Sequence, residues 1–430
     1  MSELPYTKDG PRAWCVCMAV TFINVILWGS TYTYGVIFPV LLDEFQEGKA
    51  KTAWVGSLAL SLIMFFSPTA AKLSARLGPR PVSVIGALIA ALGLFSTSQV
   101  NSIELMYLTY SVLFGTGASC VLIAGVDIYP QYFDKHFSLA VGIVQAGIGA
   151  SFMMSPLLDF LLTSFGWRKT FLAMGGISLI AGIIPAVFFI PNVLQKTENA
   201  LHPSETEVVP SQDLQSVWKN KALVVYSMTI FVMEFGNQIG MVHMGRYIQE
   251  RGQGSDQAAF LYLAYGIATT IGRLVAGKIL DVPFLNPVYV FAVFATLVGA
   301  TTSACTLGRG FAWFMSYFVI NGFSNGCAVG TIVLLTMTSV EPSQTAEGMG
   351  MWLMVDAFAF ASGPAFGGYL ADLLGSYVVV FYMAGGITIT SAFVMLMVKC
   401  FGLEKQRMVT NTQRRQIVEL MITYEKETVV

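Results

Sequence analysis

Charged side chains are scarce in this sequence. Lys, Arg, Asp and Glu make up 11% of its 430 residues, whereas soluble globular proteins carry about 25%. The formal net charge is −1 and there is no long basic run, so nucleic acid is not expected as a partner. The sequence also lacks a paired nucleophile and base, a phosphate-binding glycine loop and a metal-ligand motif. These absences argue against an enzyme, a cofactor and a bound metal.

Cysteine is also infrequent, and it lies mostly within apolar segments. The six cysteines do not have the spacing of a metal site: Cys15, Cys17, Cys120, Cys305, Cys327 and Cys400. We interpret them as small buried hydrophobic residues. Residues 1–13 are polar and lack the apolar core of a cleavable signal peptide, so we expect them to form a cytosolic N-terminal tail.

Long apolar runs, by contrast, are abundant. A membrane-spanning helix needs roughly 20 mostly apolar residues. Twelve runs approach or exceed this length: 14–40, 53–73, 82–99, 104–128, 138–161, 169–190, 222–247, 257–279, 287–307, 311–339, 347–371 and 377–400. The polar segment 191–221 divides them six and six. The sequence therefore predicts an all-α integral membrane protein that crosses the lipid bilayer twelve times, with six-helix bundles at 14–190 and 222–400.

The distribution of Lys and Arg predicts the orientation, because short cytoplasmic loops retain positive charge. One side of the predicted topology collects Lys8, Arg12, Lys72, Arg76, Arg80, Lys135, Lys196, Lys219, Lys221, Lys278 and most of the basic residues after 400. The other side has Lys49, Lys51, Arg168, Lys169, Arg246, Arg251 and Arg309. We therefore expect both termini, the linker 191–221 and the tail 401–430 to be cytosolic.

The two predicted halves are related in sequence. FLAMGGIS (171–178) corresponds to FYMAGGIT (381–388), and at an offset of 208 residues Gly142 and Pro156 meet Gly350 and Pro364. Together these matches indicate a duplicated six-helix unit. Parallel repeats of this kind are typical of major facilitator carriers, whose substrate site lies near the membrane midplane between the halves.

Two short stretches resemble signatures of the monocarboxylate transporter family. YFDKHFSLAVGIVQAG (132–147) is similar to the family's cytosolic loop motif, and DGPRAW (9–14) resembles a degraded form of its N-terminal motif. The resemblance implies a plasma-membrane carrier of a small organic carboxylate. It is also compatible with a single-span accessory glycoprotein as a partner. Small residues such as Gly142, Ala146 and Gly147 should let the fifth span pack closely against a neighbour.

The resemblance also implies a difference from the family's lactate carriers. Those carriers have an Asp four residues before an Arg in the eighth span and a Lys in the first span, where proton and carboxylate are handled. Here Arg273 matches the arginine, but Thr269 and Val36 occupy the other two positions. The resemblance therefore implies that this chain has the arginine that binds an anion and lacks the aspartate and lysine of the proton-handling pair.

Arg273 has two interpretations from the sequence. It lies about six residues from the end of its span, or ~9 Å at 1.5 Å per residue, so its side chain could extend to the headgroups. Against this, Ala268, Gly272 and Ala276 form a small-residue stripe that predicts close helix packing and would turn Arg273 toward the protein interior. A guanidinium that remains charged can hold a carboxylate through two parallel hydrogen bonds.

Other polar residues within the spans are candidates for the same site. Intramembrane acids usually pair, protonate or line water, which makes Asp127, Glu234 and Asp356 candidates for coupling and Glu234 also a candidate for substrate binding. The remaining substrate-binding candidates are Asn24, His243, Thr269, Asn321 and Asn325. For each of them, lining a cavity and hydrogen bonding to a neighbouring helix are both open.

We interpret the chain as a carrier that moves a small carboxylate-bearing solute by alternating access. A monocarboxylate, an amino-acid-like solute and a creatine-like solute all fit this interpretation. Facilitation without a coupling ion is the expected mode, because the proton-handling pair is replaced. The alternatives are proton-coupled symport and a transporter-like receptor or scaffold without net flux.

Overall fold

The structure is a computed structural model, and it describes residues 8–32, 34–47, 49–188, 217–252, 255–282, 285–341 and 344–400. Within these ranges it consists of helices, without strands. The α-helices are α1 (Pro11–Tyr32), α2 (Tyr34–Phe45), α3 (Lys49–Phe65), α4 (Ser67–Leu77), α5 (Pro79–Thr97), α6 (Ile103–Met106), α7 (Gly115–Ile128), α8 (Phe137–Ala150), α9 (Met154–Phe188), α11 (Lys221–Glu250), α12 (Ser255–Ile279), α13 (Pro287–Ala304), α14 (Phe311–Thr338), α15 (Thr345–Leu374) and α16 (Tyr377–Cys400). Shorter elements are the π-helix η1 (Tyr107–Phe114) and the 3-10 helices η2 (Tyr129–Tyr132), η3 (Ser151–Met153) and η4 (Val217–Lys219).

The number of membrane crossings depends on two breaks. Ten helices of the described residues are long and apolar enough to cross a membrane, or eleven if α3 and α4, bent by 44°, form one crossing. The continuous stretch Phe137–Ile184 is 48 residues long, which is about 70 Å of helix and roughly twice the hydrocarbon thickness. Gly166 interrupts it with a φ of 77°, a conformation that glycine adopts without strain. Two crossings in this stretch give the predicted twelve.

One predicted span is bent in the structure. The first predicted span, 14–40, is covered by α1, which ends at Tyr32, and α2, which begins at Tyr34; residue 33 lies outside the described residues. The second is bent next to Phe66, where α4 begins with a proline in its first turn. The predicted linker 191–221 lies mostly outside the described residues, and so do residues 1–7 and the tail 401–430.

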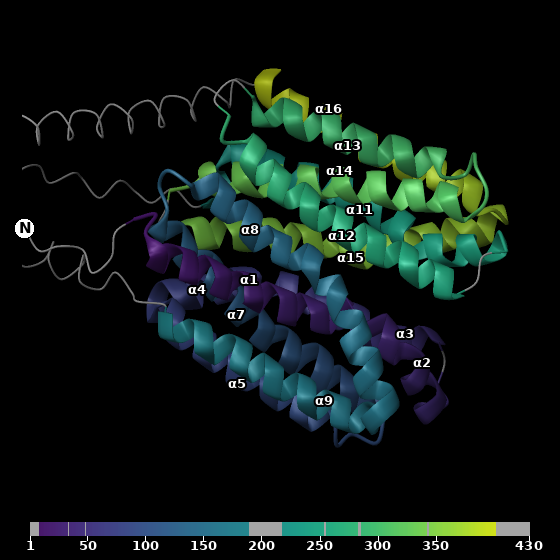
Figure 1. The fold of residues 1–430 in the computed structure, drawn as a ribbon, viewed down its shortest axis with the longest axis horizontal. Coiled ribbons are helices and arrows are strands. Elements are labelled where there is room, and N and C mark those ends of the chain that lie inside the picture. Colours follow the sequence, from purple (N-terminus) through teal and green to yellow (C-terminus); the bar gives the residue numbers. More distant parts are fainter. Residues whose placement is uncertain are drawn as a thin grey trace, which may run out of the picture.

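The helices form two bundles that lie side by side (Figure 1). The first half contains α1–α9 and the second contains α11–α16. The start of α1 and the end of α16 lie at the same end of the molecule, which we call the terminal end (Figure 1). The two halves approach each other most closely there and diverge toward the opposite end (Figure 1).

The most extensive contacts between the halves are made by α8 with α12 and by α15 with α3, α4 and α7. Small residues allow these approaches. A Cβ atom added to Gly142 of α8 would lie 2.9 Å from the Gly277 Cα of α12, and one added to Gly350 of α15 would lie 3.0 Å from the Pro68 Cα of α4. Near the terminal end, the Tyr129 hydroxyl donates to the sulfur of Met337 across the two halves at 3.1 Å.

The two signature-like stretches contact each other at the terminal end. The Asp9 carboxylate accepts hydrogen bonds from the backbone amides of Asp134, Lys135 and His136, at 3.4, 3.0 and 3.1 Å. The Trp14 ring meets the Phe133 ring edge-on, with centroids 5.0 Å apart. A carboxylate beside free amides at the start of a helix is favourable, so Asp9 fixes the loop that leads into α8.

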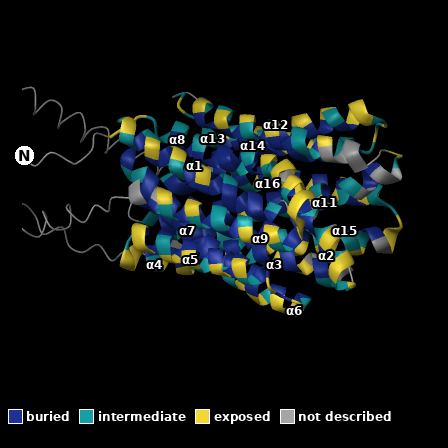
Figure 2. Ribbon diagram, turned by 60° about the horizontal axis from the view of Figure 1, so that its bottom comes forward, coloured by how far each residue is buried: buried dark blue, intermediate teal, exposed yellow. Residues whose placement is uncertain are grey.

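The outer faces of the bundles are apolar. Figure 2 shows exposed residues along the outside of the helices and buried residues between them. Large exposed hydrophobic side chains include Leu88 and Leu92 on α5 and Phe393 and Met397 on α16. Contiguous exposed apolar surface of this kind indicates contact with lipid.

Candidate functional site

A cavity of about 520 Å³ lies between the two halves. Its wall is formed by α1, α3, α4, α7 and α8 of the first half and by α11, α12, α14 and α15 of the second. Cavities of roughly 300–1,000 Å³ hold small organic ligands in proteins. The position between two repeated bundles is also the position that the repeat predicted for a substrate site.

Arg273 of α12 lies in the cavity wall and is only 8% exposed. Its Nη1 donates to the backbone oxygen of Gln145 at 3.0 Å and to the Gln145 Oε1 at 3.3 Å. Among the described residues no carboxylate forms an ion pair with it. The guanidinium is thus held inside the protein by the opposite half, and its charge is not neutralised there.

The small-residue stripe explains why Arg273 points inward. A Cβ atom added to Gly272 would lie 2.3 Å from the backbone oxygen of Phe323, so α12 and α14 are in direct backbone contact. This contact occupies the neighbouring face of α12 and leaves Arg273 on the face that borders the cavity. The side chain does not extend to the headgroups in this structure.

Glu234 of α11 also lines the cavity and is held by three side-chain amides. Its oxygens accept from Asn237 at 3.1 Å, Gln238 at 3.0 Å and Asn325 at 3.4 Å. The last donor lies on α14, so the network joins two helices of the second half. These bonds satisfy the carboxylate without a positively charged partner.

Within the described part of the chain, four buried polar atoms of cavity-wall residues have no hydrogen-bond partner. They are Thr269 Oγ1, Arg273 Nε, Trp352 Nε1 and Asp356 Oδ1. Buried polar groups are normally hydrogen-bonded, and an unsatisfied one costs about 1–3 kcal/mol. The Nε of Arg273 and the Nε1 of Trp352 can only donate a hydrogen bond. The other two atoms are a carboxyl oxygen of Asp356 and the hydroxyl of Thr269. The residues of the cavity wall therefore contain both unsatisfied donors and an unsatisfied acidic oxygen.

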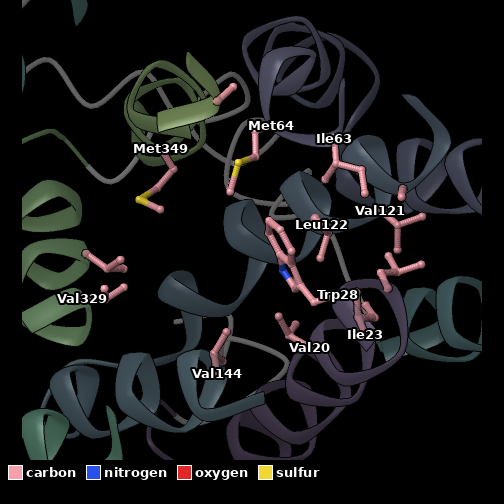
Figure 3. Packing of buried hydrophobic residues seen from close by; sticks show 14 of the residues in the cluster. Val20, Ile23, Trp28, Ile63, Met64, Val121, Leu122, Val144, Val329 and Met349 are labelled. Atoms are coloured by element: carbon pink, nitrogen blue, oxygen red, sulfur yellow. The ribbon is translucent and has the colours of Figure 1, made fainter. Parts of the chain in front are cut away.

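Aromatic and aliphatic side chains complete the wall. Trp28 and Tyr32 stack with ring centroids 5.5 Å apart, and Phe152 stacks on Tyr32 at 5.2 Å and meets Tyr265 edge-on at 6.2 Å. Figure 3 shows part of the aliphatic wall, which both halves supply: Met64, Leu122, Val144, Val329 and Met349. The cavity therefore offers a few charged and neutral polar groups within a mostly apolar enclosure.

The structure brings together six of the sequence-predicted site residues: Asn24, Glu234, Thr269, Arg273, Asn325 and Asp356. Asn24 donates to the backbone oxygen of Val144 at 2.9 Å, so it also ties α1 to α8. Val36 is absent from the cavity wall and packs against the hydrophobic core. Thr269, at the position of the family's aspartate, is on the wall.

The other three candidates lie outside the cavity wall, in contacts between helices. His243 Nε2 is 2.9 Å from the backbone oxygen of Pro364, and Asp127 accepts from Ser74 at 2.6 Å. Asn321 donates to the backbone oxygen of Val298 and to the hydroxyls of Thr301 and Thr302. These hydrogen bonds connect one helix to another, and the Asn321 Oδ1 is left without a partner among the described residues.

Gln145 is the residue that the sequence analysis missed. It is buried, lines the cavity and holds Arg273. Its signal in the sequence is an amide side chain within the apolar and small residues of VGIVQAGIGA (141–150). The structure shows no group of three or more His, Cys, Asp or Glu side chains arranged for a metal ion in the part of the chain that it describes.

Comparison with known proteins agrees with this geometry. The family model of the Major Facilitator Superfamily matches residues 20–349 and 285–426. Monocarboxylate transporter 10 of Mus musculus is 28% identical over 98% of this chain and 85% of its own length. Monocarboxylate transporter 13 of Rattus norvegicus is 26% identical (90% of this chain, 89% of its own) and monocarboxylate transporter 4 of Mus musculus 28% (94% and 87%).

These relatives confirm the resemblance that the signature-like stretches indicated. The matched residues extend through both bundles, and the relatives are transporters rather than enzymes. The apolar helices and the matches agree on a multi-pass integral membrane protein. The chain is a membrane carrier with two six-helix halves, and it belongs to the Major Facilitator Superfamily.

Proposed function

We propose that this carrier moves a small carboxylate-bearing organic solute by alternating access, without a coupling ion. The observation that supports the proposal is Arg273, a buried guanidinium on the cavity wall that has no carboxylate partner among the described residues. A buried charge of this kind is costly unless it is paired. A substrate carboxylate would supply the pair and could accept two parallel hydrogen bonds. The names of the relatives agree with a carboxylate as cargo.

Facilitation is supported by the residues that replace the family's proton-handling pair. Thr269 is neutral, and Val36 is apolar and off the cavity wall. The distribution of Lys and Arg supports cytosolic termini, and with that orientation the terminal end of the molecule faces the cytosol. The plasma membrane as location and a single-span accessory glycoprotein as partner remain predictions from the family resemblance.

The test is uptake of labelled carboxylates by liposomes that contain the purified full chain. Arg273→Ala should nearly abolish uptake, since removing one partner of a buried charge pair costs roughly 2–5 kcal/mol. Arg273→Lys should retain part of it, because the charge remains but the planar fork is lost. Arg168→Ala is the matched control, because the Arg168 guanidinium donates to the backbone oxygens of Ser98 and Val100 and is absent from the cavity wall.

Arg273→Ala protein that inserts normally and transports at the parental rate would overturn the proposal. Specific binding of carboxylates without uptake would instead support the receptor interpretation. Strong acceleration by an inward proton gradient would support symport.

A further inference from the structure

Three basic side chains gather where α4 is followed by α5, near the terminal end of the first half (Figure 2). Lys72 and Arg76 lie on α4, Arg80 is the second residue of α5, and all three are exposed. Gly78, with a φ of 89°, turns the chain from one helix into the other. We call Lys72, Arg76 and Arg80 the basic patch.

The charge of the basic patch is not neutralised within the protein. In the part of the chain that the structure describes, none of its three residues forms an ion pair. Lys72 and Arg76 are four positions apart on one helix, so their side chains are neighbours on its surface. Like charges in this arrangement destabilise a helix. An anion bound between them would remove the repulsion.

The acids on the neighbouring helices do not serve as that anion. α4 packs against α7 and α15, which carry Asp127 and Glu347 near this end. Asp127 accepts a hydrogen bond from Ser74 at 2.6 Å, and neither acid is in an ion pair among the described residues. The corresponding connection of the second half, between α12 and α13, differs. There, exposed Lys278 is followed by exposed Asp281.

The basic patch lies at the margin of the apolar outer surface. Leu77, Ile85, Leu88 and Leu92 are exposed on α4 and α5, and exposed apolar surface of this kind contacts lipid. Ile85 follows Arg80 by five residues, or ~7.5 Å at 1.5 Å per residue. Polar headgroups flank the hydrocarbon core of a bilayer, so the basic side chains are at the depth of the headgroups.

We propose that the basic patch binds the headgroup of an anionic phospholipid whose acyl chains lie along the apolar face of α5. Arginine can hold a phosphate through two parallel hydrogen bonds, and lysine adds a point charge. Basic clusters at a membrane surface attract anionic lipids. Because α4 also packs against α15, the bound lipid lies beside a contact between the two halves. The proposal does not depend on which solute the carrier moves.

Two lipids with identical acyl chains test the proposal. Dioleoylphosphatidylserine carries a net negative charge, and dioleoylphosphatidylcholine carries none. Each is added to the purified full chain in a neutral detergent, and thermal unfolding is measured. A ligand that binds only the folded protein raises the unfolding temperature in a saturable way. The serine lipid should do so and the choline lipid should not. At about 1 M salt the difference should shrink, because the Debye length falls to about 3 Å.

The variants identify the binding residues. Each Lys or Arg near a membrane surface contributes roughly fivefold to the affinity for an anionic lipid. Arg76→Gln should therefore raise the apparent Kd for the serine lipid about fivefold, and the combined Lys72→Gln, Arg76→Gln and Arg80→Gln protein roughly 100-fold. Lys278→Gln is the matched control, because it removes one exposed basic residue from the other half. Its Kd should remain at the parental value.

Two results would overturn the proposal: equal stabilisation by the two lipids, and a parental Kd in the combined variant. Equal stabilisation by glycerophosphoserine, which has the headgroup without acyl chains, would also overturn it and assign the basic patch to a soluble phosphate compound. If the combined variant fails to fold, Arg76→Gln and the two lipids on the parental protein still decide. None of these measurements involves uptake, so their failure leaves the carboxylate carrier untouched.

Discussion

Replacing Gln145 with glutamate should weaken transport, because it gives Arg273 a permanent carboxylate partner. The Arg273 Nη1 now donates to the backbone oxygen of Gln145 at 3.0 Å and to its side-chain oxygen at 3.3 Å. Glutamate has the same length as glutamine and places a charged oxygen where the amide oxygen lies. A substrate carboxylate would then have to displace an internal one.

The size of the effect follows from this competition. A hydrogen bond to a charged group contributes about 1.5–3 kcal/mol, and each 1.4 kcal/mol changes an equilibrium constant tenfold. The KM for substrate should therefore rise by roughly 10- to 150-fold. Because the new pair joins α8 of one half to α12 of the other, the Gln145→Glu protein should also unfold at a higher temperature.

The assay is saturable uptake in liposomes, together with thermal unfolding of the purified protein. Gln145→Ala is the control, since it removes the 3.3 Å bond and keeps the 3.0 Å bond to the backbone. Its KM should stay within about threefold of the parental value, as expected for a single modest bond. A Gln145→Glu protein with normal insertion and parental KM would refute the role given to Arg273.

Three further predictions concern coupling, the N-terminal contact and the packing between the halves. An imposed proton gradient should change the uptake rate little, because Thr269 replaces the family's aspartate; acceleration that disappears when the cavity acids are neutralised would contradict this. Asp9→Ala should lower the free energy of unfolding by about 1 kcal/mol, as for loss of a helix cap, without changing KM; an unchanged melting temperature would argue against the contact. Gly277→Ala should destabilise the protein by about 1–3 kcal/mol through overpacking, because the new Cβ would lie 2.9 Å from backbone atoms of α8. Gly176→Ala, which meets nothing within 4 Å, is its control in thermal unfolding.

The sequence predicted the helical class and the two halves because apolar run length is a strong signal in a membrane protein. It predicted only part of the helix breaks. Gly166, with its φ of 77°, lies between two predicted spans, in agreement with the prediction, whereas the 44° bend between α3 and α4 falls inside the second predicted span. Such breaks depend on local backbone geometry and on neighbouring helices, which a hydropathy pattern does not contain.

The candidate site was predicted in part. Arg273, Glu234 and Asp356 stand out because charges within spans are rare, and all three lie on the cavity wall. Asn321 and Asn325 have the same chemistry and lie one helical turn apart, yet Asn325 borders the cavity and Asn321 bonds to α13. A polar residue needs a partner in either place, so its type does not reveal which way it points.

Gln145 is a site residue that could not be predicted from its local sequence. Its importance comes from Arg273, which is 128 positions away in the chain. Pairing across the two halves is a property of their arrangement, and nothing in the local sequence of α8 specifies it.

The crossing of α8 and α12 has a mechanical consequence. A Cβ atom at Gly142 would lie 3.0 Å from the backbone oxygen of Arg273, and a Cβ atom at Gly149 would lie 2.9 Å from the Thr270 Cα. The guanidinium is thus carried by the helical turn that rests directly on the other half. Under the proposed alternating access, a movement of one half relative to the other would move this turn of α12 and the Arg273 guanidinium with it. Substrate binding and the change of exposure would then be coupled directly at the contact between α8 and α12.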